Sequence, residues 1–381
     1  MNKYSKISLF RLTILTLASF LIWNCSDATK NEVSDSRIIQ NPEYGSKQNT
    51  VPTPFEFVLE DSIFIQLPED FILSGISFLN TDKNGNFYFM DIAQSKLISV
   101  SPDGTLRWIT GEKGKGPGDF ESVWGISILD SSIMINNINS SRLDYFDFEG
   151  NFIKSTSLGK DVGFSSIVGI TKNGNLVMSG PNWDSFGHSI LLVKPESDSL
   201  FVEHSFKIDE SNGVKVAKGF NAKTEIHIID DNIVTGSIHD YSFSIYDLEG
   251  TLLKNIHRDF DRIVRPGMYV SEEFSVLNSF GSTASPFKIN NDLYLATANW
   301  PTNVSDPDQF TKRAALGSEE RVQFMNTIDF FDANWNLLYS KESDGYDSKI
   351  GRIQLVKDES IFTAKAEPSP TIFRYRILER N

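Results

Sequence analysis

Short runs of apolar, β-branched and aromatic residues recur along this chain, separated by tight polar turns. The clearest unit spans Ser74 to Thr110 and reads as four such runs, with turns at Asp82–Gly85 and Pro102–Gly104. Turns of this composition tolerate positive φ and join antiparallel strands. Later units follow at residues 125–153, 168–193, 226–253, 287–339 and 352–375. A repeat of about 40 to 50 residues with four strands in each unit is typical of a β-propeller.

The sequence therefore predicts an all-β chain folded as a six-bladed β-propeller with four-stranded blades. The sixth unit supplies only three strands, and one apolar segment, Phe55 to Leu67, is left over near the N-terminus. We expect this segment to join the last blade as its fourth strand and close the ring, which removes open sheet edges. No long amphipathic helices alternate with the strands, which argues against a two-domain α/β fold.

A glycine-rich run, Gly111 to Phe120, precedes the second unit and is followed by Val123–Ile126. It resembles the Gly-Pro-Gly-Glu-Phe element before the inner strand of NHL-like propellers, with Asp119 in place of Glu. The whole region from Phe55 to the C-terminus is similar to the six-bladed propeller lipoproteins of the Bacteroidetes. The resemblance implies the propeller fold and a lipoprotein, and it assigns no activity.

The N-terminus reads as a secretory signal that ends at the chain's single cysteine, Cys25. Basic residues are followed by an apolar run, Leu12 to Trp23, which is shorter than the roughly 20 residues that a membrane span needs. Leu21 to Cys25 resembles a lipobox, so Cys25 is the predicted lipidation site. The predicted domains are a signal peptide (1–24), a flexible lipid-tethered leash (25–54) and the propeller (55–381). The alternative is an ordinary secreted protein with an idle Cys25.

The single cysteine excludes an internal disulfide, and its lipidation would leave no thiol as a nucleophile. The formal net charge is −14 and becomes −17 when Lys3, Lys6 and Arg11 leave with the signal. Because such a surface repels polyanions, we expect no nucleic-acid partner. We expect membrane attachment through the lipid anchor, on the outer membrane of the cell envelope, with the periplasmic or the surface side left open.

Strand order in a propeller places the long insertions of this chain on a single face. This insertion-rich face would carry the following segments: residues 111–123, 180–188, 209–223, 257–281 and 300–321. Long loops in compact domains are commonly functional, so we expect the working surface here. Short helices are expected near Ser271–Phe280 and Thr311–Phe324.

Aromatic and charged residues gather in these insertions, as a saccharide or peptide site would require. The candidate ligand-binding residues are Trp124, Trp183, Asp184, His188, Arg262, Arg265 and Trp300. For Trp183 and Trp300 the alternative is that the ring anchors a loop at the rim.

Catalytic motifs such as a nucleophile elbow, a zinc-binding His-Glu-x-x-His pair or a P-loop are absent from the sequence. The favoured hypothesis is a binding module for peptide, protein or glycan, with no cofactor. The alternative is a hydrolase or lyase that depends on a divalent metal in the central funnel. Oxygen ligands there would suit Ca²⁺, and the candidates are Asp91, Asn137 (or its neighbour Asn136) and Asp184.

Overall fold

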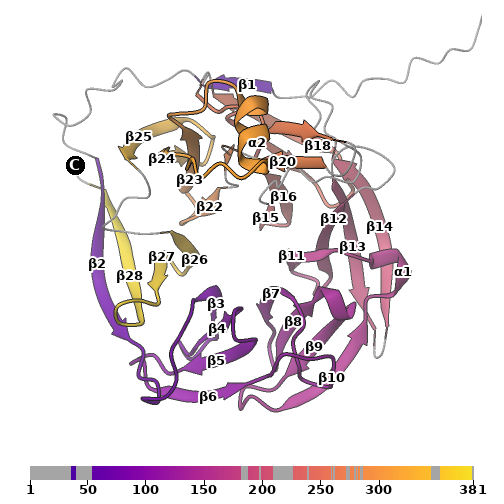
Figure 1. Ribbon diagram of the computed structural model, residues 1–381. Helices are drawn as coiled ribbons and strands as arrows, with labels where there is room; N and C mark the ends of the chain where they lie inside the picture. Colours follow the sequence, from indigo (N-terminus) through magenta and orange to yellow (C-terminus); the bar gives the residue numbers. More distant parts are fainter. Residues whose placement is uncertain are drawn as a thin grey trace, which may run out of the picture.

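A computed structural model describes most of the chain beyond residue 53. The described residues are 36–39, 54–181, 188–196, 199–208, 226–237, 240–258, 260, 262–271, 275–278, 280, 282–283, 286–344 and 352–379. Six antiparallel sheets are arranged as blades around a central axis, so the fold is a six-bladed β-propeller, as predicted (Figure 1).

The blades run in sequence order from the inner strand outward, except that blade 6 takes its outer strand from the N-terminal segment. Blade 1 has β3 (Ser77–Thr81), β4 (Phe87–Asp91), β5 (Lys96–Val100) and β6 (Leu106–Thr110). Blade 2 has β7 (Val123–Ile128), β8 (Ile133–Asn137), β9 (Arg142–Phe146) and β10 (Phe152–Ser157). Blade 3 has β11 (Ser166–Ile170), β12 (Leu176–Pro181), β13 (His188–Pro195) and β14 (Leu200–Ile208).

The remaining blades follow the same plan with small additions. Blade 4 has β15 (Ile226–Ile229), β16 (Asn232–Thr235), β17 (Ser242–Tyr246) and β18 (Leu252–Arg258). Blade 5 has β21 (Ser282–Thr283) and β22 (Phe287–Lys288), both paired with β23 (Leu293–Pro301), then β24 (Phe324–Asp332) and β25 (Leu337–Asp344). Blade 6 has β26 (Ile353–Lys357), β27 (Ser360–Lys365) and β28 (Thr371–Glu379). Two short helices are η2 (Ile138–Ser140) and α1 (Gly159–Val162).

The N-terminal strand closes the ring, as the leftover apolar segment predicted. Strand β2 (Phe55–Phe64) pairs antiparallel with β28 along its whole length and becomes the outer strand of blade 6. A further strand, β1 (Ser36–Ile39), lies within the segment expected to form a leash and pairs in parallel with β18 at the outer edge of blade 4.

The core consists of apolar layers between neighbouring blades. Between blades 1 and 2, Leu97 packs with Ile133 and Phe146, and these side chains are fully or almost fully buried. Between blades 6 and 1, Phe362 packs edge-on against Phe87, with ring centroids 5.7 Å apart. Burial of apolar surface, worth about 25 cal/mol per Å², thus holds each blade to the next.

Side-chain amides of blades 6, 1 and 2 bond to backbone carbonyl oxygens in or beside the next blade. Gln354 donates from Nε2 to Ile76 O of blade 1 at 3.2 Å, and Asn80 donates from Nδ2 to Ile126 O of blade 2 at 3.1 Å. Asn136 continues the series by donating from Nδ2 to Ser165 O, beside blade 3, at 2.9 Å. These bonds fix the blade spacing around the axis.

Aspartate-centred turns close the other face of the ring. In three of them, at Asp82, Asp147 and Asp332, the carboxylate accepts backbone N–H groups two and four residues later, and a side-chain amide four residues later. Burial opposes ionisation of Asp82, but hydrogen bonds from Asn86 and Tyr88 outweigh it and lower the pKa of this carboxyl. The turns are therefore held by local bonds and leave little room for insertions.

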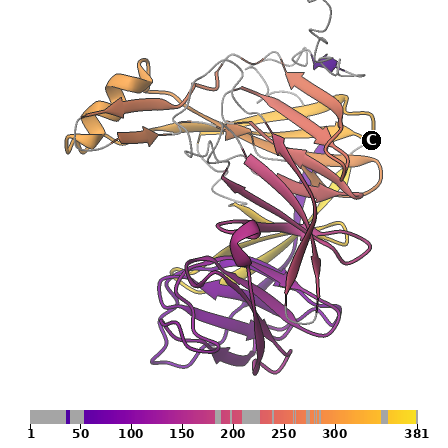
Figure 2. The ribbon, with the colours of Figure 1, turned by 90° about the vertical axis from the view of Figure 1, so that its right-hand side faces the viewer.

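Two insertions meet to form an arm that stands out from the ring (Figure 2). We define the arm as β19 (Gly267–Val270), β20 (Ser275–Asn278) and α2 (Pro307–Ala315). The prediction of a helix near Ser271–Phe280 is wrong, because β20 forms an antiparallel hairpin there with β19. The second expected helix, Thr311–Phe324, overlaps α2 only over residues 311–315. Helix α2 begins earlier, because Asp306 caps its first N–H groups and Pro307 occupies its first turn, and it already ends at Ala315.

Candidate functional site

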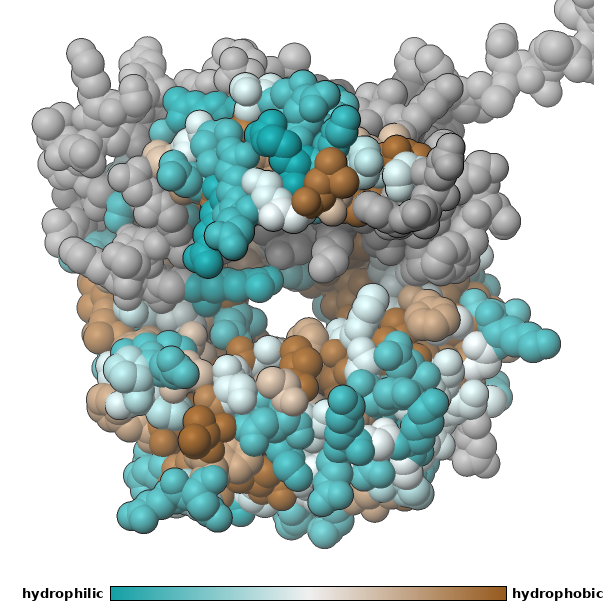
Figure 3. Space-filling model, viewed as in Figure 1, coloured by the Kyte–Doolittle hydropathy of each residue, from teal (hydrophilic) through white to brown (hydrophobic). Residues whose placement is uncertain are grey.

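Apolar side chains are exposed on the insertion-rich face around the opening of the ring. In blade 1 these are Ile72 and Ile92, and Gln94 Nε2 holds the backbone at Ile72 by donating to its carbonyl oxygen at 2.6 Å. In blades 2 and 3 they are Trp124 and Phe164, which are 50% and 55% exposed. Figure 3 views this face and shows apolar residues beside the central opening. Apolar exposure gathered on one face is typical of a binding surface.

Trp124 owes its position to a β-bulge at the start of the inner strand of blade 2. Val123 pairs with Asn137 and Gly125 with Asn136, so Trp124 is the extra residue with no partner of its own. Bulges of this kind redirect a side chain out of the regular sheet pattern. The indole Nε1 donates to Ser122 Oγ at 3.1 Å, which fixes the ring while half of it stays exposed.

The glycine-rich segment before Trp124 folds around the carboxylate of Asp119. Gly116 N donates to Asp119 Oδ2 at 3.1 Å. A Cβ atom at Gly114 or Gly116 would lie only 2.6 or 2.7 Å from the same oxygen, closer than real Cβ contacts. The two glycines leave room for the carboxylate of Asp119, and the segment is a blade-to-blade turn.

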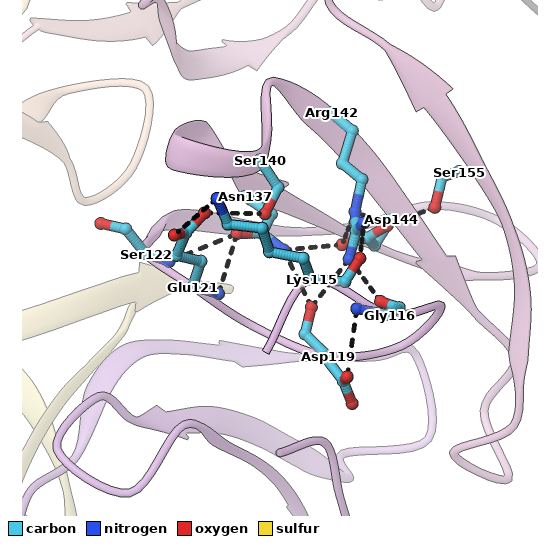
Figure 4. A network of polar contacts seen from close by, with 10 residues as sticks. All are labelled: Lys115, Gly116, Asp119, Glu121, Ser122, Asn137, Ser140, Arg142, Asp144 and Ser155. Carbon is cyan, nitrogen blue, oxygen red and sulfur yellow. Dashed lines mark hydrogen bonds and ion pairs between the residues drawn. The ribbon is translucent and has the colours of Figure 1, made fainter. Parts of the chain in front are cut away.

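A buried polar network holds this segment against blade 2 (Figure 4). Arg142 donates to the carbonyl oxygens of Lys115, Gly116 and Asp119 at 2.7–2.9 Å. Its guanidinium also pairs with the fully buried Asp144, with Nε 2.8 Å from Oδ1. Charge-assisted bonds of this kind are about twice as strong as neutral ones.

Asn137 completes this network from the end of β8. Its Oδ1 accepts the backbone N–H groups of Glu121 and Ser122 at 3.2 and 3.3 Å. Its Nδ2 donates to Asp119 O and to Asp144 Oδ2 at 2.9 and 3.0 Å. Since Ser122 in turn binds the indole of Trp124, the network positions the exposed aromatic ring.

The arm is ordered by a small core and a bidentate ion pair of its own. Phe280, Val304 and Phe310 are buried together at its base. Arg265 donates from both terminal nitrogens to Asp308, at 3.0 and 2.7 Å. Mainly through the hydrogen bond from Arg265, with help from the N–H of Met268, the pKa of Asp308 falls to about 2. The arm is thus a preorganised projection that lifts Met268 and Val270 away from the ring.

Two predicted ligand-binding residues, Arg262 and Trp300, do come together near the arm. Arg262 Cζ lies 5.5 Å from the ring centroids of both Trp300 and Phe260, and Arg262 Nη1 donates to Glu342 at 2.7 Å. Trp300 is only 4% exposed, so its ring is packed as a loop anchor, and Arg262 offers the exposed charge.

For three other predicted ligand-binding residues, Trp183, Asp184 and His188, the structure describes no side chain. Trp183 and Asp184 lie outside the described residues. His188 begins β13, where it pairs with Ile208, and only its backbone is described. Phe164 and Ile92 belong to no sequence motif, so they could not be predicted and are recognised only by their exposure.

The proposed metal ligands are occupied within their own blades. The fully buried Asp91 accepts from Ser74 N at 2.7 Å and from Gln94 Nε2 at 2.7 Å, while Asn137 serves the network described above. Among the described residues, no three His, Cys, Asp or Glu side chains are grouped so that they could hold a metal ion. In the same part of the chain, no helix is long and apolar enough to cross a bilayer.

Comparison with known proteins supports the fold. No family model and no curated protein matches the sequence. The structure is similar to a member of the DUF4221 family from Bacteroides vulgatus, with 12% identity, a TM-score of 0.58, and coverage of 86% of this chain and 99% of that one. It is also similar to a Bacteroides fragilis protein described as exported, with 10% identity, a TM-score of 0.53, and coverage of 91% and 100%.

A weaker likeness is to virginiamycin B lyase from Staphylococcus aureus, with 10% identity, a TM-score of 0.45, and coverage of 85% of this chain and 100% of that one. At such identities the two Bacteroides structures support the propeller fold alone. The lyase carries no argument about activity.

Proposed function

We propose that this protein is a lipid-anchored binding module of the cell envelope, which recognises a peptide, a protein or a glycan with its insertion-rich face. The observation that carries the proposal is the gathering of exposed apolar side chains, Ile72, Ile92, Trp124 and Phe164, on that face. The arm adds a second apolar element on the insertion-rich side, where Met268 and Val270 are exposed.

Rigidity supports a recognition role. The network of Arg142, Asp144 and Asn137 fixes the segment that carries Trp124, and the arm has its own core. A surface ordered before binding loses less conformational entropy when a ligand arrives, which raises affinity for a given contact area.

Location in the envelope rests on the signal-like N-terminus and the predicted acylation of Cys25. A structurally similar protein is described as exported, which is compatible with this location. We further propose that the chain belongs with the NHL-like propeller lipoproteins. Replacement of Cys25 by Ser should release the protein from the membrane fraction and abolish labelling by a fatty-acid precursor. Continued membrane labelling would contradict lipidation at this residue.

The binding face can be tested by site-specific photo-crosslinking in living cells. A crosslinker at Ile92 should capture a discrete partner or glycan-bearing species. The matched control is Leu253, a 38% exposed apolar residue on the outer strand of blade 4. Equal capture from both positions, or none from Ile92, would contradict a working surface on the insertion-rich face.

A further inference from the structure

The chain reaches the propeller at blade 4, before the strand that closes the ring. Strand β1 lies along the outer edge of blade 4 and pairs with β18, starting with Ser36 opposite Asn255 (Figure 1). Only residues 26–35 separate Cys25 from Ser36. A chain of this length spans at most about 40 Å, whereas the chain from Cys25 to Phe55 would span up to about 110 Å. The pairing of β1 therefore ties a lipid on Cys25 to the outer edge of blade 4.

Three outer strands expose an apolar side chain at the same structural position. In β10, β18 and β25 a β-bulge leaves the second residue of the strand without a partner of its own. Bulges redirect a side chain out of the regular sheet pattern. We call these three exposed residues the apolar rim, and they are Ile153 in blade 2, Leu253 in blade 4 and Leu338 in blade 5.

The apolar rim lies toward the face opposite the insertions. Each of its residues follows a tight turn of that face, in which the backbone N–H of an aspartate donates to the carbonyl oxygen four residues later. The three aspartates are Asp147, Asp247 and Asp332. Contact with a flat surface along the apolar rim would therefore leave the insertion-rich face free.

The other blades carry a charged residue at the bulge of the outer strand. These residues are Arg107 in blade 1, Glu203 in blade 3 and Glu60 in blade 6. Blade 3 still exposes Phe201, two residues before Glu203. Apolar exposure on the outer strands toward this face thus runs from blade 2 to blade 5, and blade 4, which receives β1, belongs to that arc.

We propose that the apolar rim rests on the lipid surface to which Cys25 is attached, with blade 4 nearest the bilayer and blade 1 farthest from it. The inference rests on the lipid anchoring proposed above. Apolar side chains enter the boundary between headgroups and acyl chains, and burial of their surface contributes about 25 cal/mol per Å². Lys154 and Lys254 directly follow two of the rim residues and add positive charge beside anionic headgroups.

Quenching by a nitroxide on lipid headgroups tests this orientation. The acylated full-length protein is inserted into preformed vesicles of phosphatidylethanolamine and phosphatidylglycerol that contain the nitroxide lipid. Because acylation occupies the thiol of Cys25, a fluorophore can be attached to one introduced cysteine. Leu253→Cys should be quenched several-fold more strongly than Ile92→Cys, the matched control, which replaces an exposed apolar residue of blade 1. Equal quenching, or stronger quenching at Ile92, would overturn the proposal.

A pair of proline substitutions tests the contribution of β1. Proline cannot donate a hydrogen bond to a neighbouring strand, so Arg37→Pro combined with Ile38→Pro should release β1 from β18. Quenching of the fluorophore at Leu253→Cys should then fall. Gln48→Pro combined with Asn49→Pro is the control, because these residues lie between β1 and β2, and it should leave quenching unchanged. Equal quenching in both proline variants would overturn the role of β1.

Serine substitutions test the apolar rim itself. The fluorophore is placed at Glu249→Cys, in the exposed turn before β18. Its quenching should fall when all three rim residues are replaced by Ser, with an unchanged circular dichroism spectrum because these side chains are exposed. The control, Ile72→Ser combined with Ile92→Ser, removes apolar surface from the insertion-rich face and should leave the quenching unchanged. Equal effects of the two sets would overturn contact through the rim.

The outcomes separate this inference from the anchored binding module. Release of the Cys25→Ser variant from the membrane fraction, together with equal quenching at Leu253 and Ile92, would overturn the apolar rim and leave the anchor standing. Retention of Cys25→Ser in the membrane fraction would overturn the anchor, and with it the orientation.

Discussion

Replacement of Arg142 by Met should strongly destabilise the propeller and release the segment that carries Trp124. Arg142 pairs with the fully buried Asp144 and donates to three backbone carbonyl oxygens of residues 115–119. Methionine keeps much of the apolar stem but leaves a buried carboxylate without its cation. Breaking a buried ion pair in this way costs about 3–5 kcal/mol.

Urea unfolding followed by fluorescence measures this loss. Lys115→Met is the matched control, because Lys115 also forms an ion pair, with Glu121 at 3.4 Å, but its side chain is 76% exposed. An exposed pair contributes about 0–1 kcal/mol, so the control should barely shift the midpoint. Because Arg142 is far less exposed than Lys115, the loss of unfolding free energy should be several-fold larger for Arg142→Met than for Lys115→Met.

A double-mutant cycle with Asp144→Asn isolates the pair. Asn cannot carry the buried charge, so Arg142→Met should cost much less in the Asp144→Asn background than in the natural one. The reasoning would be refuted by equal losses in both backgrounds, or by an Arg142→Met loss no larger than that of Lys115→Met.

Three further predictions concern the arm and the metal alternative. The pKa of Asp308 is lowered from 3.8 to about 2, so the stabilisation from Arg265 is present above pH 4 and is lost as the pH falls toward 2. The protection factors of the β19 amides against hydrogen exchange should fall over that window, and Arg265→Gln should show the lower protection already at pH 5. Gly267→Ala would place a Cβ atom 2.1 Å from Pro307 O, so the arm should become sensitive to proteolysis, whereas Gly75→Ala, which meets nothing within 4 Å, should not. Thermal unfolding of the full-length protein should have the same midpoint in EDTA and in added Ca²⁺, and a midpoint that falls in chelator and recovers with calcium would instead favour the funnel-metal hypothesis.

The repeat pattern was sufficient to predict the ring and its closure. Strand and turn signals are local: each Asp or Gly turn is held by bonds within five residues, as at Asp82, so a single sequence reveals it. The closing strand was predictable by counting strands. The last repeat unit lacked a fourth strand, and the apolar segment Phe55–Leu67 belonged to no other unit.

The candidate site was less predictable because its geometry depends on distant contacts. Trp300 and Trp124 look alike in sequence, yet Trp300 is buried against Phe260 while Trp124 is exposed by a bulge. The hairpin at 275–278 forms because the arm packs two insertions together, which neither insertion reveals alone. Helix α2 was detectable from Asp306–Pro307, a start signal that the sequence analysis placed too late.

The pairing of β2 with β28 has a consequence for how the protein is made. Phe55 pairs with Glu379, so the first strand of the domain has no partner until the last residues of the chain are available. During synthesis from the N-terminus, β2 therefore stays unpaired while the other blades are being made. Contacts of such long sequence separation slow folding and leave incomplete chains prone to association. A chain that stops before β28 would leave β2 without its partner strand, so the ring can close only after synthesis has reached β28.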